Sequence, residues 1–239
     1  MLLASASLGA SIVFGQQLNR AKPASRLPGQ RAIVFDERFS ALRTQPDVKA
    51  PITQRLRYGH LVGLLSTPRG KPNGPRFYRV AASLNTRGWI LVEAVARRGR
   101  VEDAERVMKL MAGANDDFTR ARLARLCADE FRLTPVAPRA LLALGQTAER
   151  AAERLSREAK RRLGDEEPDN GISKRDYLLN YAGLDRYNRL GITFDYDVAG
   201  ERIIYDGAAY QELLRKYPRS TQADEARQRL AKLKSAGQG

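Results

Sequence analysis

The spacing of apolar residues changes near residue 100, and this change constrains the fold more than any other feature of the sequence. Before that point, short apolar runs alternate with turn residues, which is typical of short β-strands. These runs are Ile33–Phe35, Ala41–Leu42, Leu61–Leu65, Phe77–Val80 and Gly88–Leu91. From residue 101 onward the apolar residues recur at helical spacing instead. The sequence therefore predicts an α+β chain with two parts.

The first part, residues 31–97, is predicted to form a small β-barrel, because a sheet of this size protects its edges best by curling on itself. Three of its motifs resemble those of bacterial SH3 domains. They are Leu42-Arg43-Thr44-Gln45-Pro46, Leu56-x-x-Gly59-x-x-Val62 and Arg87-Gly88-Trp89-Ile90. The first resembles the Leu-Arg-x-x-Pro opening of the family, the second its next turn and strand, and the third its closing Gly-Trp-Val. The sequence departs from the family at Phe77, where a Trp is usual, and in a long loop over residues 66–75.

The SH3 resemblance implies a binding module whose aromatic side chains line a peptide groove. Four aromatic residues are candidates, namely Tyr58, Phe77, Tyr78 and Trp89. At least half of them are needed to fill the core of so small a domain. Trp89, on the closing strand, is expected to be largely buried. Tyr58 and Tyr78 are expected to be the exposed members and are the candidate ligand-groove residues.

The second part, residues 101–234, is predicted to be mostly helical. Helices are expected from about residue 101, over 117–131, from beyond Pro138 to about 163, and over 174–187. Alternating apolar residues predict a β-hairpin within residues 192–205. The segment around Tyr217-Pro218 predicts two amphipathic helices, which resemble the tetratricopeptide repeats of periplasmic Tol-Pal and outer-membrane assembly proteins. This resemblance covers about thirty residues and implies a tetratricopeptide-like interaction region.

Counting cysteine and histidine excludes several kinds of active site. Cys127 is the only cysteine and His60 the only histidine, so a Cys/His zinc cluster, a two-histidine metal site and an internal disulfide are ruled out. Cys127 lies in a helical apolar pattern and is expected to be a small buried side chain rather than half of a Cys–His dyad. His60 has no nucleophile or carboxylate pattern near it in the sequence and is expected at the surface.

The carboxylates of Asp195 and Asp197 share one face of a predicted strand. A hard cation such as Ca²⁺ needs six or more oxygen ligands, so an exposed hairpin face explains this pair better than a metal site. The sequence also has neither a Gly-x-x-x-x-Gly-Lys loop nor a Gly-x-Gly-x-x-Gly fingerprint, which leaves nucleotide use unsupported. We therefore expect no enzymatic activity, no cofactor, no metal and no small-molecule substrate.

The first fifteen residues are uncharged and rich in Leu, Ala, Ser and Ile, which is typical of a signal-peptide core. Cleavage is expected after Gly15, and residues 16–30 have the composition of a linker. An apolar N-terminal helix packed on the protein is the alternative. No stretch approaches the ~20 apolar residues that a membrane-spanning helix requires. The chain is therefore expected to be exported, to the periplasm or the cell exterior, and not to span a membrane.

The formal net charge of +15 favours contact with polyanions. Together with the predicted export and the two resemblances to binding modules, it predicts a non-catalytic scaffold or interaction protein of the cell envelope. The expected partner is a protein, a peptide or an anionic envelope polymer. The alternatives are an intracellular protein that binds nucleic acid and an accessory protein of a cell-wall hydrolase. Nucleic acid is the less favoured partner, because a bias towards Arg in the coding sequence accounts for part of the charge.

Overall fold

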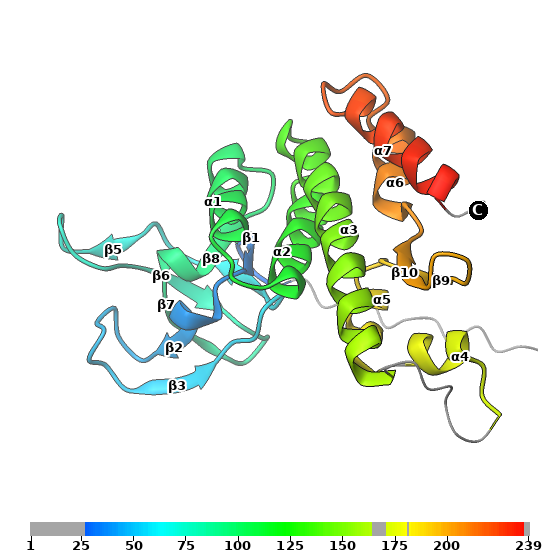
Figure 1. The fold of residues 1–239 in the computed structure, drawn as a ribbon. Coiled ribbons are helices and arrows are strands. Elements are labelled where there is room, and N and C mark those ends of the chain that lie inside the picture. The colour runs from blue at the N-terminus through cyan, green and yellow to red at the C-terminus, as the bar shows by residue number, and fades with distance from the viewer. Residues whose placement is uncertain (1–26, 164–170, 181, 237–239) are drawn as a thin grey trace, which may run out of the picture.

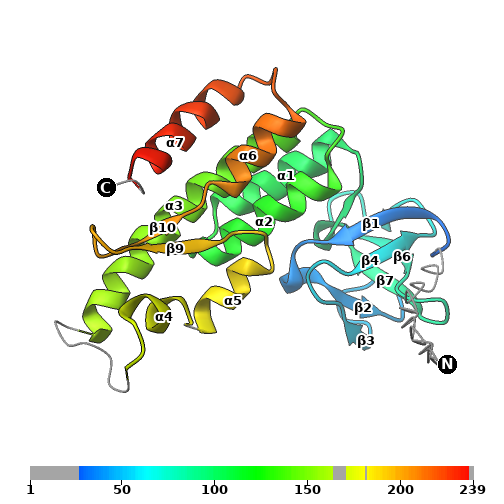
Figure 2. The same cartoon turned by 90° about the vertical axis from the view of Figure 1, so that its right-hand side faces the viewer.

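The computed structural model describes residues 27–163, 171–180 and 182–236. The signal-peptide core over residues 1–15 and all but the end of the linker lie outside the described residues. An antiparallel sheet occupies one end of the molecule, and helices α6 and α7 lie at the other end (Figure 1). A view from the side shows α1, α2 and α3 between them (Figure 2). The arrangement is mixed, with strands first and helices after them along the chain, and is compatible with the predicted α+β class.

The sheet has eight strands. They are β1 (Gln30–Val34), β2 (Ala41–Arg43), β3 (Ile52–Arg55), β4 (Leu61–Leu64), β5 (Arg69–Gly70), β6 (Arg76–Ala81), β7 (Arg87–Leu91) and β8 (Val95–Arg97). Their order is β3-β2-β7-β6-β4-β1-β8, with β5 paired to β6 beside this path, and every pair is antiparallel. The path is open in the described residues, since it ends at β3 and β8. The closed barrel predicted from the sequence is therefore not confirmed.

The strands of the sheet bury alternate side chains on one face. Tyr78 and Val80 of β6 and Ile90 of β7 point into a core that also receives residues from the other strands. The further members of this core are Ala32, Val34, Leu42, Leu56, Val62, Leu64, Ala82, Ala94 and Val95. Because successive side chains of a strand point to opposite faces, Arg79 and Trp89 lie on the other face of the sheet. The register places these two residues directly opposite each other.

Seven α-helices follow the sheet in the described residues. The first three are α1 (Val101–Ala112), α2 (Asp117–Glu130) and α3 (Val136–Leu163). Each packs against the next, and α3 also contacts the hairpin and α6. The helix predicted to begin beyond Pro138 in fact begins at residue 136, so this proline lies in the first helical turn. A proline is tolerated there because the first N–H groups of a helix have no carbonyl partner in any case.

The chain then forms α4 (Lys174–Leu179), α5 (Ala182–Asn188), the β9–β10 hairpin (Phe194–Asp197 and Arg202–Tyr205), α6 (Ala208–Lys216) and α7 (Ala223–Ala236). The single helix predicted over 174–187 is wrong, because α4 ends at residue 179 and α5 begins at residue 182. The predicted hairpin is confirmed by its antiparallel register.

A row of five aromatic rings joins this second half of the helical region to α2. Successive rings lie 5.4–6.4 Å apart between centroids, mostly edge to face, which is a favoured geometry for aromatic pairs. The rings belong to Phe118, Tyr187, Phe194, Tyr205 and Tyr210. Tyr210 packs so closely on Gly145 of α3 that a Cβ there would collide with its ring. The row therefore fixes α5, the hairpin and α6 against the long helix.

Besides its own core, the sheet contributes residues to the hydrophobic core of the helices. Ile33, Phe35 and Ala96 point away from the sheet's own core and pack in the same cluster as α1, α2 and α3. The junction between β8 and α1 is held by the buried carboxylate of Asp103, which accepts hydrogen bonds from the N–H and Nε of Arg97 at 2.9 and 2.7 Å. Burial alone would raise the pKa of Asp103, but the hydrogen bonds from Arg97 outweigh it and lower that pKa.

This shared core predicts that the sheet and the helices unfold together. Trp89 is the only tryptophan, so its fluorescence reports on the sheet, while far-ultraviolet circular dichroism reports mainly on the helices. We expect the two signals to give coincident denaturant transitions. Phe131→Ala, in the helical core and fully buried, should lower the free energy of unfolding by about 3–5 kcal/mol in both signals.

Leu133→Ala is the control for that experiment. Leu133 is 90% exposed, two residues from Phe131, and its truncation should change the free energy of unfolding by no more than about 0.5 kcal/mol. Two separate transitions, with Phe131→Ala moving only the helical one, would show that the two parts fold independently.

Candidate ligand-binding site on the sheet

Tyr58 and Tyr78 are predicted to line a peptide groove, but neither lines the pocket found on the sheet. Tyr78 is only 6% exposed and belongs to the sheet's core, so the expectation that it is exposed is wrong. Tyr58 is half-buried between the sheet and α2, where its hydroxyl donates to the backbone carbonyl of Arg122. The guanidinium of Arg122 lies 4.0 Å from the centroid of the Tyr58 ring. Burial raises the pKa of this phenol. Tyr58 thus joins the sheet to the helices, and neither side chain lines the pocket described below.

Trp89 also differs from its expected role. The SH3 resemblance predicts a largely buried tryptophan, but Trp89 is only partly buried and lies on the face opposite the core. Ile90, its neighbour on β7, is fully buried and fills the core position instead. Gly88, on the other side of Trp89, approaches Leu42 so closely that it has no room for a Cβ. The indole is therefore available to solvent in a pocket of the sheet.

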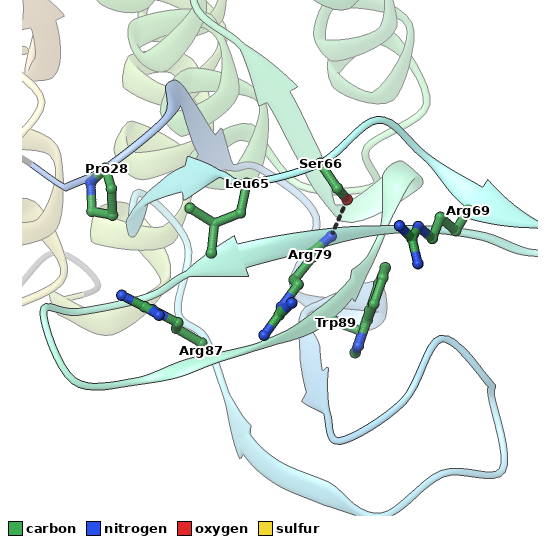
Figure 3. A pocket seen from close by; sticks show the side chains of 7 residues that line it. All are labelled: Pro28, Leu65, Ser66, Arg69, Arg79, Arg87 and Trp89. Carbon is green, nitrogen blue, oxygen red and sulfur yellow. Dashed lines mark hydrogen bonds between the residues drawn. The ribbon is translucent and has the colours of Figure 1, made fainter.

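The pocket is formed by strands β6 and β7 and the loop that carries β5. Figure 3 shows the indole of Trp89 beside the Arg79 side chain, with Arg69 across from it and Arg87 further along the face. Arg79 is directly opposite Trp89 in the register, and Arg87 is two residues before Trp89 on the same strand. Their side chains therefore share one face. The pocket has a volume of about 300 Å³ and is lined by Pro28, Leu65, Ser66, Arg69, Arg79, Arg87 and Trp89.

The long loop over residues 66–75 positions Arg69. It folds back so that β5 pairs with β6, with Arg69 opposite Phe77. Gly70 makes this pairing possible, since it has φ +155° and a Cβ there would collide with the carbonyl of Pro75. The guanidinium of Arg69 lies 5.7 Å from the centroid of the Trp89 ring, within the range of a cation–π contact. Ser66 closes the base of the loop by accepting a 3.2 Å hydrogen bond from the N–H of Arg79.

The opposite end of the pocket is formed by Pro28 and Leu65. Gly63 of β4 allows the chain before β1 to approach, because a Cβ at this position would collide with the carbonyl of Pro28. In the part of the chain that the structure describes, the walls of the pocket thus come from the sheet and its loops.

The charge of the pocket is not neutralised. Arg69, Arg79 and Arg87 are exposed, and none of them forms an ion pair with an acidic side chain of the described residues. The helical region differs: Arg125, for example, pairs with both Asp129 and Glu212. The hydrogen bonds from Arg125 and Lys216 lower the pKa of Glu212 to about 2. The arginines of the pocket therefore retain their full attraction for an outside anion.

The excess of positive charge lies mostly in the part of the chain that forms the sheet. Residues 27–100 contain 14 Lys and Arg against four Asp and Glu, which is +10 of the total +15. Residues 101–239 contain 25 against 23 and are nearly neutral. This asymmetry is readable from the sequence and is the signal that could have located the site, whereas the total charge could not.

Comparison with protein-family models, curated proteins and solved structures finds no match to this chain. The chemistry of the pocket itself must therefore indicate its function.

The other residues singled out from the sequence, namely Cys127, His60, Asp195 and Asp197, are buried or contact neighbouring groups of the protein. Cys127 is fully buried, as predicted, and burial raises the pKa of its thiol to about 12. The Nε2 atom of half-buried His60 lies 2.9 Å from the backbone carbonyl of Ala82. Asp195 pairs with Arg175 at 2.8 Å and Asp197 with Arg202 at 3.1 Å, so both carboxylates of the hairpin have cationic partners.

The described residues provide no other centre for chemistry or for membrane insertion. Within 27–163, 171–180 and 182–236, no three His, Cys, Asp or Glu side chains are grouped so that they could hold a metal ion. None of the helices in this part of the chain combines the length and apolar character needed to cross a membrane. The lining of the pocket contains no carboxylate, thiol or imidazole. What the pocket offers is an aromatic surface and three guanidinium groups, which are means of binding an anion.

The positive charge around Trp89 predicts how ions quench its fluorescence. Anions gather near the three arginines and cations are repelled, so iodide should quench Trp89 more than caesium does. We expect the iodide-to-caesium ratio of Stern–Volmer constants to exceed that of free N-acetyltryptophanamide by about twofold or more at low salt. The excess should disappear at high salt, where the Debye length shrinks.

Arg79→Gln should reduce this excess, since Arg79 is the direct neighbour of Trp89 across the strands. Arg157→Gln removes the same charge from an exposed position on α3 and should leave it unchanged. Equal ratios for the protein and the free amino-acid derivative would contradict the electrostatics described here.

Proposed function

We propose that this chain is a non-catalytic interaction protein of the cell envelope that binds an anionic polymer through the sheet. The observation that carries this proposal is the pocket in which Arg69, Arg79 and Arg87 surround Trp89 without acidic partners among the described residues. Guanidinium groups are well suited to this role, because each presents a fork of N–H donors that matches a carboxylate or phosphate.

The envelope is the proposed compartment because of the first fifteen residues, whose composition is that of a signal-peptide core. The SH3-like and tetratricopeptide-like resemblances point in the same direction, since both families act by binding. In this proposal the sheet is the SH3-like module and attaches to the polymer. The helical region, with its nearly balanced charge and its α6–α7 pair, is the scaffold for a protein or peptide partner.

Removal of the three pocket arginines tests the proposal. The triple variant Arg69→Gln, Arg79→Gln and Arg87→Gln should lose binding to isolated cell-wall sacculi. An exposed contact between opposite charges is worth about 0.5 kcal/mol, so the loss of three should lower the affinity about tenfold at low salt. Binding of the unmodified protein should weaken steeply between ~0.15 and ~1 M salt, as the Debye length falls from about 8 to 3 Å. Sedimentation with sacculi measures both effects.

A matched triple variant controls for net charge. Arg157→Gln, Arg161→Gln and Arg215→Gln remove the same three charges from exposed positions on α3 and α6, and should retain most of the binding. Duplex DNA is assayed in parallel. Tight DNA binding without retention on sacculi would favour the nucleic-acid alternative, and binding to neither polymer would overturn the proposal in favour of a protein-only scaffold.

Export is tested separately from binding. If residues 1–15 are a signal-peptide core, the mature protein in its native host should begin near Gln16 and should be found outside the cytoplasm. Fractionation of the host followed by mass spectrometry of the N-terminal peptide measures this. Recovery of an intact Met1 in the cytosol would overturn the envelope assignment without affecting the binding site.

A further inference from the structure

The pocket on the sheet combines two different recognition elements at short range. The first is the indole of Trp89, a flat apolar surface. The second is the set of three guanidinium groups that line the pocket with it, those of Arg69 and Arg79 beside the indole and that of Arg87 further along the face (Figure 3). Trp89 and Arg79 are directly opposed in the register, and residues so placed on antiparallel strands typically have Cβ atoms about 4.5–5.5 Å apart. Arg87 is two residues along β7, at about 7 Å. A ligand that uses both elements must therefore carry acidic groups within one ring's width of a flat face.

Charge alone does not account for this arrangement. An inorganic or glycerol-based polyphosphate would be bound by the arginines but would have no ring to place on the indole. Arg69 lies over the Trp89 ring at 5.7 Å and Arg79 beside it, so an anion held by either guanidinium is brought against the aromatic surface. The pocket thus matches an anion whose own framework includes a flat apolar face.

Single-stranded nucleic acid has such rings but needs a different surface. Proteins that bind it stack successive bases on several aromatic side chains along a basic groove. Among the described residues, Trp89 is the only aromatic one that lines this pocket. Phe77 and Tyr78, consecutive residues of the neighbouring strand β6, are buried. The volume of about 300 Å³ is also at the lower end of the ~300–1,000 Å³ typical of ligand pockets, which suits one ring and its substituents.

We infer that the pocket binds an acidic sugar unit of a glycan, with the C–H face of the pyranose ring stacked on Trp89 and its carboxylate held by Arg79 and Arg87. This inference rests on the proposed polymer-binding function and names the ligand chemistry of that same site. A pyranose ring presents a flat set of C–H groups to an aromatic ring. Its carboxylate, attached directly to that ring, can reach the fork of an adjacent arginine.

The experiment uses the full chain and compares four probes by isothermal titration calorimetry at ~0.15 M salt. They are oligogalacturonate, the neutral oligogalactoside of the same length, inorganic polyphosphate and oligo(dT). Trp89 fluorescence is recorded in parallel, and it reports on the pocket directly because the chain has no other tryptophan. We expect oligogalacturonate to bind most tightly and to shift the Trp89 emission. The neutral oligomer should bind at least about tenfold more weakly, since it lacks the charge-assisted hydrogen bonds.

Two variants separate the ring from the charges. Trp89→Leu keeps an apolar side chain but removes the stacking surface. It should lower the affinity for oligogalacturonate about tenfold and leave the affinity for polyphosphate unchanged. Arg79→Gln should lower the affinity for both ligands, whereas the charge-matched Arg157→Gln should lower neither affinity. Circular dichroism melts establish that Trp89→Leu is folded, and the Arg79→Gln result provides a second measurement if it is not.

The outcomes distinguish this inference from the proposed function. If polyphosphate binds as tightly as oligogalacturonate and Trp89→Leu changes neither, the acidic-sugar inference is overturned and polyanion binding stands. If oligo(dT) binds most tightly and depends on Trp89, the ligand is a nucleic acid instead. If none of the three polyanions binds, the proposed function fails together with the inference.

Discussion

Burial of Tyr78, Val80 and Ile90 in the core of the sheet is the constraint on which the candidate site depends. These side chains fix which face of β6 and β7 is inside, and strand alternation then places Trp89 and Arg79 outside. A slip of one residue in either strand would exchange the two sets. The hydrophobic core thus determines the position of a polar binding surface that none of its own members forms.

The helical region supports this sheet from another side. Ile33 and Phe35 of the first strand and its extension are buried among helices rather than in the sheet's own core. The Asp103 carboxylate, hydrogen-bonded to Arg97, ties the last strand to the first helix. The described residues that line the pocket, in contrast, all lie between 28 and 89. The helices can therefore hold the strands in register without covering the site, which is why we expect pocket variants to affect binding much more than stability.

The sequence predicted the strands that carry apolar runs. It also predicted the hairpin from alternating apolar residues and most helices from apolar residues at helical spacing. It did not reveal β3, because all four side chains of Ile52–Arg55 are exposed and leave no alternation to detect. The placement of Trp89 failed for a related reason. Gly88-Trp89-Ile90-Leu91 is a continuous apolar run, so its composition cannot tell which alternate residues face the core. Only the pairing of Arg79 with Trp89 resolves this, and pairing is a tertiary property.

The uneven distribution of charge makes the sheet end of the molecule basic and leaves the helical end nearly neutral. Unpaired arginines at the sheet repel one another, and that repulsion is relieved when an anionic ligand binds. The helical end is nearly neutral, with most of its arginines near carboxylates such as Glu212 and Asp117, and exerts no comparable attraction beyond a Debye length. A polyanion should therefore approach the sheet first. Because α6 and α7 lie at the far end of the molecule, the proposed attachment through the sheet would leave them free to contact a second partner (Figure 1).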